Sequence, residues 1–178
     1  MKSVLISIQP KWCELIASGE KTVEVRKTKP KLETPFKCYI YATKSGDRLV
    51  LKNDKVFEIS KAITGKVIGE FVCDKILDIC IEMSSPDYLP DYPFPCTGLT
   101  DKEILQYLGN GKTGYGWHIV DLVIYDKPKD LSEFEVECKG GCDIPFLYSH
   151  PCEKCGKNRL TRPPQSWCYV EGEGYGIY

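Results

Sequence analysis

The sequence predicts an α+β fold, in which a small, partly closed β-barrel of about six strands carries short helices at its mouth. Many short segments are rich in β-branched and apolar side chains, which favour strands. Only two segments show the apolar spacing of a helix, and both are short. The 178 residues are enough to bury one core, so we expect a single domain over residues 1–178.

Composition excludes several classes of protein. Apolar residues make up 42% and charged residues 28% of the chain, which fits neither a disordered tail nor a membrane protein. No apolar run approaches the roughly 20 residues that span a bilayer, and residues 1–20 lack the features of a signal peptide. We therefore expect a cytoplasmic protein without a membrane partner.

The net charge of −1 hides an asymmetry along the chain. Residues 1–75 carry 15 Lys and Arg against 9 Asp and Glu, so this half is basic and the rest is acidic. A basic face suits a modest binder of a nucleotide or a short nucleic-acid segment, although solvated lysines can also serve solubility alone.

The first elements follow from local signals. Lys2–Ile8 reads as a buried strand, and Pro10 can open a helix in its first turn. That helix should run over residues 11–18 and end at Gly19, with one apolar face formed by Trp12, Leu15 and Ile16.

Residues 21–26 alternate, so Val23 and Val25 should point one way and Glu24 and Arg26 the other. Residues 27–35 form a loop that contains lysines and prolines, and residues 85–96 hold four prolines and should be irregular. Further strands are expected at 37–42, 48–51, 66–76, 77–83, 116–125 and 167–171.

Thr100 and Glu103 match a capping box, with Leu99 and Ile104 placed as its hydrophobic staple. This pattern predicts a second helix that ends at Gly109.

A cluster of charged side chains follows the first helix. Glu24 and Arg26 share a strand face, so they can pair or converge on one ligand, and Lys21 lies just before them at the mouth of the strand. A Lys, a Glu and an Arg can contact a nucleobase edge or a phosphate, with Trp12 or Trp167 as a stacking surface. The alternative is a surface ion pair beside a structural tryptophan.

The segment IQPKWCELIASGEKTVEVRK resembles the ASCH family, a branch of the PUA-like barrels. The resemblance rests on Gln9-Pro10, Trp12 and Ile16, followed by a G-x-K-x-x-E-x-R arrangement formed by Gly19, Lys21, Glu24 and Arg26. The segments GYGWHIVDLVIYDKPKDLSEF and RPPQSWCYVE resemble the closing part of the same barrel. The resemblance covers residues 1–134 and 162–171 and leaves 135–161 unmatched.

The resemblance implies binding of RNA, or of a nucleotide, in a cleft that carries this motif. Lys21 and Arg26 would meet phosphate or base acceptors, and Glu24 would orient Arg26 or accept a hydrogen bond from a base amine. Trp167 would stack on the base. The expected ligand-binding set is Gln9, Trp12, Lys21, Glu24, Arg26 and Trp167.

One branch of the family resembles amidohydrolases that remove the acetyl group from N4-acetylcytidine. That branch implies a Lys at position 21, a Thr at position 24 and a later Glu, whereas this sequence has Glu24. As an alternative function, Lys21 or Glu24 could act as the catalytic base on an N4-acylated nucleoside. Glu103 is a candidate for the later Glu, although helix capping explains it better.

Four of the ten cysteines fall within 18 residues. Without an export signal, such a cluster indicates a metal before it indicates disulfides. Two pairs with short spacing, separated by nine residues, can converge on Zn²⁺ and close its shell, which is typical of a structural site; they are Cys138 and Cys142, then Cys152 and Cys155.

We therefore expect a zinc-knuckle insertion over residues 135–161 that staples strands of the barrel. His150 could replace a thiolate, but it is less well spaced; a reduced or disulfide-linked loop is the alternative without metal. Basic residues around the second pair could extend a nucleic-acid surface, and a third possible function is an adaptor whose zinc loop docks a protein partner.

Overall fold

The computed structural model describes residues 2–44, 63–80, 94–109, 111–136 and 158–172. The α+β class is confirmed, because strands dominate and the helices are short. The expected strand at 48–51 lies outside the described residues. The elements are β1 (Lys2–Ile8), α1 (Pro10–Ala17), β2 (Val23–Arg26), β3 (Phe36–Ala42), β4 (Val67–Cys80), the 3₁₀ turn η1 (Phe94–Thr97), α2 (Asp101–Leu108), β5 (Thr113–Lys129), the 3₁₀ turn η2 (Leu131–Glu133), β6 (Glu135–Val136), β7 (Asn158–Arg159) and β8 (Trp167–Glu171).

All described strands join one sheet in the order β2-β5-β4-β3-β1-β8-β6-β7. Strands β1 and β3 pair in parallel, and every other pair is antiparallel. The predicted partial closure into a barrel is wrong: among the described strands the sheet is open, with β2 at one edge and β7 at the other. Just before β2, the amide of Thr22 donates to the carbonyl of Cys96 at 2.8 Å, so the segment around η1 lies against the start of this edge strand.

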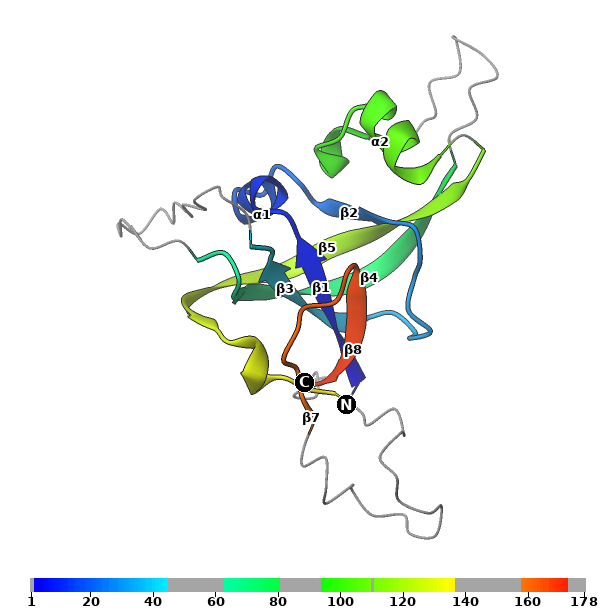
Figure 1. Cartoon of the computed structure of the whole chain (residues 1–178). Coiled ribbons are helices and arrows are strands. Elements are labelled where there is room, and N and C mark those ends of the chain that lie inside the picture. The colour runs from blue at the N-terminus through cyan, green and yellow to red at the C-terminus, as the bar shows by residue number, and fades with distance from the viewer. Residues whose placement is uncertain (1, 45–62, 81–93, 110, 137–157, 173–178) are drawn as a thin grey trace, which may run out of the picture.

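The two long strands β4 and β5 give the sheet its curvature, and Figure 1 shows them crossing the molecule as bent ribbons. The pairing of β4 with β5 shifts register at three places, between Val67 and Gly69, Glu70 and Val72, and Cys73 and Ile76. Such bulges bend a strand without ending it. The sequence predicted separate strands at 66–76 and 77–83. Residues 67–80 instead form a single strand that the bulges bend.

The central strands are buried on both faces. On β1, Val4, Ile6 and Ile8 join the largest apolar cluster, while Leu5 joins a second cluster with Tyr41. This explains why the sequence of β1 is an almost continuous apolar run rather than an alternating one.

Helix α1 begins with Pro10 in its first turn and is followed by Gly19, whose φ of +80° suits a glycine. Of its predicted apolar face, Ile16 enters the core as expected, and Cys13 enters the core beside it. Trp12 and Leu15 are half-buried and lie against the position of Gly98 instead. The indole of Trp12 is thereby placed at the edge of the core.

Helix α2 begins with the predicted capping box: the Thr100 hydroxyl accepts from the Glu103 amide, and the Glu103 carboxylate accepts from the Thr100 amide. Its staple is confirmed as well, because Leu99 and Ile104 pack in one cluster with Val25 of β2. Figure 1 shows α1 and α2 at the same end of the sheet, on either side of the start of β2. None of the helices in the described ranges is long and apolar enough to cross a membrane.

Candidate functional site

Strand β2 contains two of the predicted charged residues, Glu24 and Arg26. Glu24 pairs with Trp117 and Arg26 with Tyr115 of β5, so both side chains lie on the same face of the sheet. Glu24 is 5% exposed and Arg26 is 8% exposed. The alternation predicted from the sequence is correct, but both charges are buried rather than displayed on an exposed strand.

Three charges form a buried chain that we call the ion triplet: Lys21, Glu24 and Arg26. Nζ of Lys21 lies 3.2 Å from Oε2 of Glu24, and Nη2 of Arg26 lies 3.0 Å from Oε1 of the same carboxylate. One carboxylate therefore bridges two cations. The Oε2 atom is buried and within ion-pair distance of Lys21, yet it makes no hydrogen bond, and Nε of Arg26 is buried without a partner as well.

Backbone carbonyls fix both cations of the ion triplet. Nζ of Lys21 donates to the carbonyl of Val23 at 2.9 Å and to the carbonyl of Thr97. Nη2 of Arg26 donates to the carbonyl of Ser7 on β1 at 2.6 Å. The cations are thus held in one geometry before any ligand arrives, which lowers the entropy that binding would cost.

The ion triplet lies in the wall of a cleft of about 670 Å³ between α1, α2 and the end of β1. Of the predicted binding residues, the structure brings Gln9, Trp12, Lys21, Glu24 and Arg26 together around this cleft. Polar and aromatic residues that were not predicted from the sequence complete its lining: Ser7, Thr43, Gln106, Tyr107, Gln165 and Ser166.

The two candidate stacking residues occupy different places. Trp12 lines the cleft, with Nζ of Lys11 over its ring at 4.0 Å from the centroid and Nζ of Lys21 at 5.6 Å. Trp167 is not among the residues that line the cleft. Its indole contacts Trp117 at 5.9 Å and Tyr169 at 5.4 Å between centroids, and its N–H donates to the hydroxyl of Thr28. The structure therefore offers Trp12, not Trp167, as the aromatic surface of the cleft.

Cys13 lies on the core side of α1, where its thiol contacts the carbonyl of Ile8 at 3.7 Å. Burial raises the pKa of this thiol far above its ordinary value, and the negative charge of Glu24 raises it further. The group is a buried, protonated side chain and does not supply a nucleophile to the cleft.

His118 and Glu103 make contacts outside the ion triplet. His118 is hydrogen-bonded through Nδ1 to Asp74 at 2.6 Å and is not among the residues that line the cleft. The carboxylate of Glu103 accepts a hydrogen bond from the Thr100 amide and so caps the start of α2. The same side chain also borders the cleft.

The four cysteines predicted to bind zinc all fall within 137–157, which lies outside the described residues. The chain on either side is described: Glu135 pairs with Arg159 and Val136 with Asn158 as an antiparallel ladder. Residues 135–136 and 158–159 therefore belong to the sheet, although the sequence placed them in an insertion. In the described part of the chain, no group of three or more His, Cys, Asp and Glu could hold a metal ion.

Known proteins share features of this sequence and this fold. The ASCH domain family matches residues 6–138. The crystal structure of ASCH from Zymomonas mobilis is similar with a TM-score of 0.56 and 18% identity, over 95% of this chain and 87% of that chain. No curated protein matches the sequence.

Two substituted forms of the same bacterial protein align equally well. A tyrosine-to-phenylalanine variant gives a TM-score of 0.57 and 18% identity over 96% of this chain and 91% of that chain. A serine-to-alanine variant gives a TM-score of 0.55 and 17% identity over 95% of this chain and 88% of that chain. At this identity the structural likeness shows the fold alone. Since the family match spans most of the sequence and includes the ion triplet, the chain belongs to the ASCH domain family, which is PUA-like.

Proposed function

We propose that this protein binds a nucleotide, either free or within single-stranded RNA, in the cleft that contains the ion triplet. The observation that carries the proposal is the position of Lys21, Glu24 and Arg26: they are almost fully buried, yet they form the wall of a cleft. Trp12 and several side-chain amides surround the same space.

Stability alone does not account for the ion triplet. Moving charges out of water costs several kcal/mol per ion, and well-packed apolar side chains often replace buried ion pairs without loss. Apolar side chains in place of the ion triplet would therefore stabilise the fold at least as well. A fixed charge array in a cleft wall is better explained by a polar ligand that the cleft receives.

The donor and acceptor pattern favours a base with an exocyclic amino group. An ionised carboxylate only accepts hydrogen bonds, and the residue Glu24 borders the cleft. The N4 amine of cytosine is a natural donor to such a group, whereas uracil presents a carbonyl at the same place. Gln9 and Gln165 border the cleft and can each donate and accept, and Trp12 offers a face for stacking.

The test is an equilibrium titration with cytidine and uridine at one fixed salt concentration. We expect cytidine to bind about tenfold tighter than uridine, equivalent to about 1.4 kcal/mol. Glu24→Gln should reduce that preference, while Asp78→Asn, a matched loss of an exposed carboxylate, should preserve it. Equal affinity for both nucleosides would contradict the role given to Glu24, and no binding of either would contradict the proposed function.

The second candidate function is hydrolysis of an N4-acylated cytidine. The contact of 3.2 Å between Lys21 and Glu24 favours it, because it places an acid and a base side by side in the cleft. Water would add to the acyl carbonyl and give a proton to Glu24; the bond between that carbon and N4 would then break, with a proton passing to N4. The products are a carboxylic acid and cytidine.

Chromatography of N4-acetylcytidine incubated with the protein distinguishes the two candidates. Released cytidine that disappears in Lys21→Met would establish the enzyme. Binding without release supports the ligand-binding proposal, which we favour because two carbonyls already hold Nζ of Lys21 in the wall.

We propose, from the sequence alone, that Cys138, Cys142, Cys152 and Cys155 hold one structural Zn²⁺. Four thiolates would close the coordination shell and leave no open position for catalysis. Metal analysis of the purified protein should find about one zinc per chain. A metal-free, folded protein would contradict the proposal.

A protein partner bound through the same loop is the remaining candidate for this segment. Deletion of residues 138–155 should leave cytidine binding intact, because the described cleft residues lie outside that range. Loss of nucleoside binding from a folded deletion variant would instead connect the loop to the cleft.

A further inference from the structure

A second hollow of about 740 Å³ lies directly beside the cleft. Ser7 and Thr43 line both spaces, so the two hollows share a wall that we call the sill. The second hollow is built from the end of β3, η2 and the segment that leads into β8; besides the sill, its lining includes Tyr41, Lys44, Asp130, Thr161, Arg162 and Pro164.

Hydrogen bonds fix the sill relative to the ion triplet. The carbonyl of Ser7 accepts from Nη2 of Arg26 at 2.6 Å, and the Ser7 hydroxyl donates to the carbonyl of Pro164 at 2.7 Å. The Ser7 amide donates to the carbonyl of Ser166 at 2.9 Å, and the Thr43 amide donates to that of Ile8 at 2.9 Å. Ser7 thus connects the cleft wall to the wall of the second hollow. The fold therefore sets the spacing between the two hollows.

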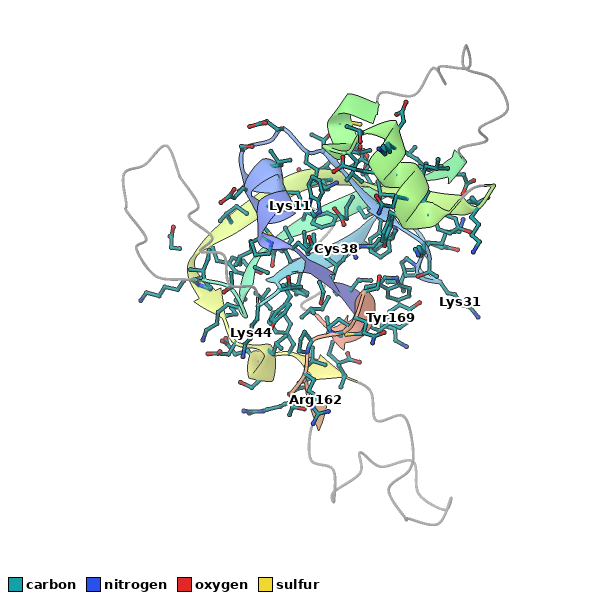
Figure 2. The ribbon with its side chains drawn as sticks, turned by 45° about the horizontal axis from the view of Figure 1, so that its top comes forward. Lys11, Lys31, Cys38, Lys44, Arg162 and Tyr169 are labelled. Atoms are coloured by element: carbon teal, nitrogen blue, oxygen red, sulfur yellow. The ribbon has the colours of Figure 1, made fainter. Side chains whose placement is uncertain are left out.

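The lining of the second hollow includes two basic side chains. Lys44 and Arg162 are exposed and form no ion pair with any described residue. The one carboxylate in the lining, Asp130, is paired with Lys66. Figure 2 labels both residues, and Lys31 lies far from them at the other side of the view. A concave site lined by a lysine, an arginine and several hydroxyl groups is suited to a phosphate.

We infer that the ligand is a single-stranded RNA segment that crosses the sill: one base enters the cleft, and the adjoining phosphate binds Lys44 and Arg162. This inference rests on the proposed function and specifies its ligand as a position within a chain rather than a free nucleoside. The hollow alone would accept any phosphate, but its fixed place next to a cleft suited to a base favours a polynucleotide, in which base and phosphate are covalently spaced.

The experiment compares cytidine, which has no phosphate, with the trinucleotide CpCpC. We expect the trinucleotide to bind at least about tenfold tighter to the wild-type protein at 50 mM salt. The double variant Lys44→Ala/Arg162→Ala should remove that gain while leaving the affinity for cytidine within about twofold. The matched control Lys75→Ala/Lys127→Ala removes two exposed lysines that border neither hollow and should retain the gain.

Salt dependence gives an independent measure. Neutralising one phosphate of a single strand contributes a slope of about −0.7 to the logarithm of affinity against the logarithm of salt, or about a 2.6-fold loss between 50 and 200 mM. The trinucleotide slope should decrease by about this amount in Lys44→Ala/Arg162→Ala and remain unchanged in the control.

Two results would overturn the inference while the proposed function stands: equal affinity of the wild-type protein for cytidine and CpCpC, or a double variant that binds CpCpC as well as the wild type does. No binding of either ligand to the wild-type protein would overturn both.

Discussion

Oε1 of Glu24 lies 3.0 Å from Nη2 of Arg26, and the same guanidinium nitrogen donates to the carbonyl of Ser7. The two side chains come from alternate positions of one short strand, so strand geometry alone brings them to the same face. Burial of both makes their contact a fixed part of the cleft wall.

The first prediction concerns the energetic coupling of this pair. Removing Glu24 leaves Lys21 and Arg26 buried without their carboxylate, so Glu24→Met should lower the free energy of unfolding by about 3–5 kcal/mol. Arg26→Met should cost less, because Lys21 still pairs with Glu24. The double variant should lose far less than the sum, with a coupling of about 2–3 kcal/mol. Urea unfolding measures all four proteins. Losses that simply add would show that the contact has no energetic role.

The two tryptophans should separate binding from stability. Trp12→Ala removes a half-buried ring at the cleft and should weaken cytidine binding by about 1–3 kcal/mol. Trp167→Ala removes a ring packed against Trp117 and Tyr169 and should instead cost about 3 kcal/mol of stability, with binding by the folded fraction preserved. Calorimetry and urea unfolding test both. A cleft role for Trp167 would follow if its loss abolished binding in folded protein.

Glu70 should contribute stability that depends on pH. Burial raises the pKa of its carboxyl, but hydrogen bonds from Lys37 and Tyr125, together with the charge of Lys37, outweigh that effect and hold the pKa below the ordinary value of 4.5. Because the folded-state pKa is lowered, this stability is present above about pH 4.5 and is lost as pH falls through the folded-state value.

The stability difference between the wild type and Glu70→Gln should therefore shrink as urea unfolding is repeated from pH 7 down to pH 3. Asp78→Asn provides the control, since Asp78 is exposed and lies 4.0 Å from Lys29. A difference for Glu70→Gln that stays constant over the whole range would refute the prediction.

The buried thiols should resist alkylation. Burial raises the pKa of Cys73 to about 12 and places that of Cys13 and Cys38 well above the ordinary value of 9.0. Since the thiolate is the reactive form, iodoacetamide at pH 8 should modify the half-buried Cys96 at least about tenfold faster than these three. Peptide mass mapping measures each rate, and the rates should converge in urea. Equal rates in native protein would contradict the burial seen here.

Local signals in the sequence predicted the elements that local physics controls. The capping box from Thr100 to Glu103 defines the start of α2, and the strand at 167–171 has its predicted bounds. The alternation of Glu24 and Arg26 was also correct, because side-chain period is a property of the strand itself. Each of these features depends on residues close together in the chain.

Features that depend on distant residues were not predictable in this way. The hydrogen bond between Thr22 and Cys96 joins residues far apart in the chain, and β6 and β7 are too short to show a period. The choice of Trp12 over Trp167 depends on packing against Trp117. Gln165 lies inside a motif that the sequence analysis quoted, and Tyr107 lies one turn after Glu103, so both could have been proposed.

The most direct test of the cleft is an NMR titration of the isotope-labelled protein with cytidine. We predict saturable shifts of the Trp12 indole and of the Glu24 and Arg26 amides, with the Trp117 and Trp167 indoles unmoved, because only the first three belong to the cleft. Shifts confined to residues outside the cleft, or no shifts up to about 10 mM cytidine, where even a binder weaker than 1 mM would respond, would contradict the assignment of the ion triplet as a ligand site.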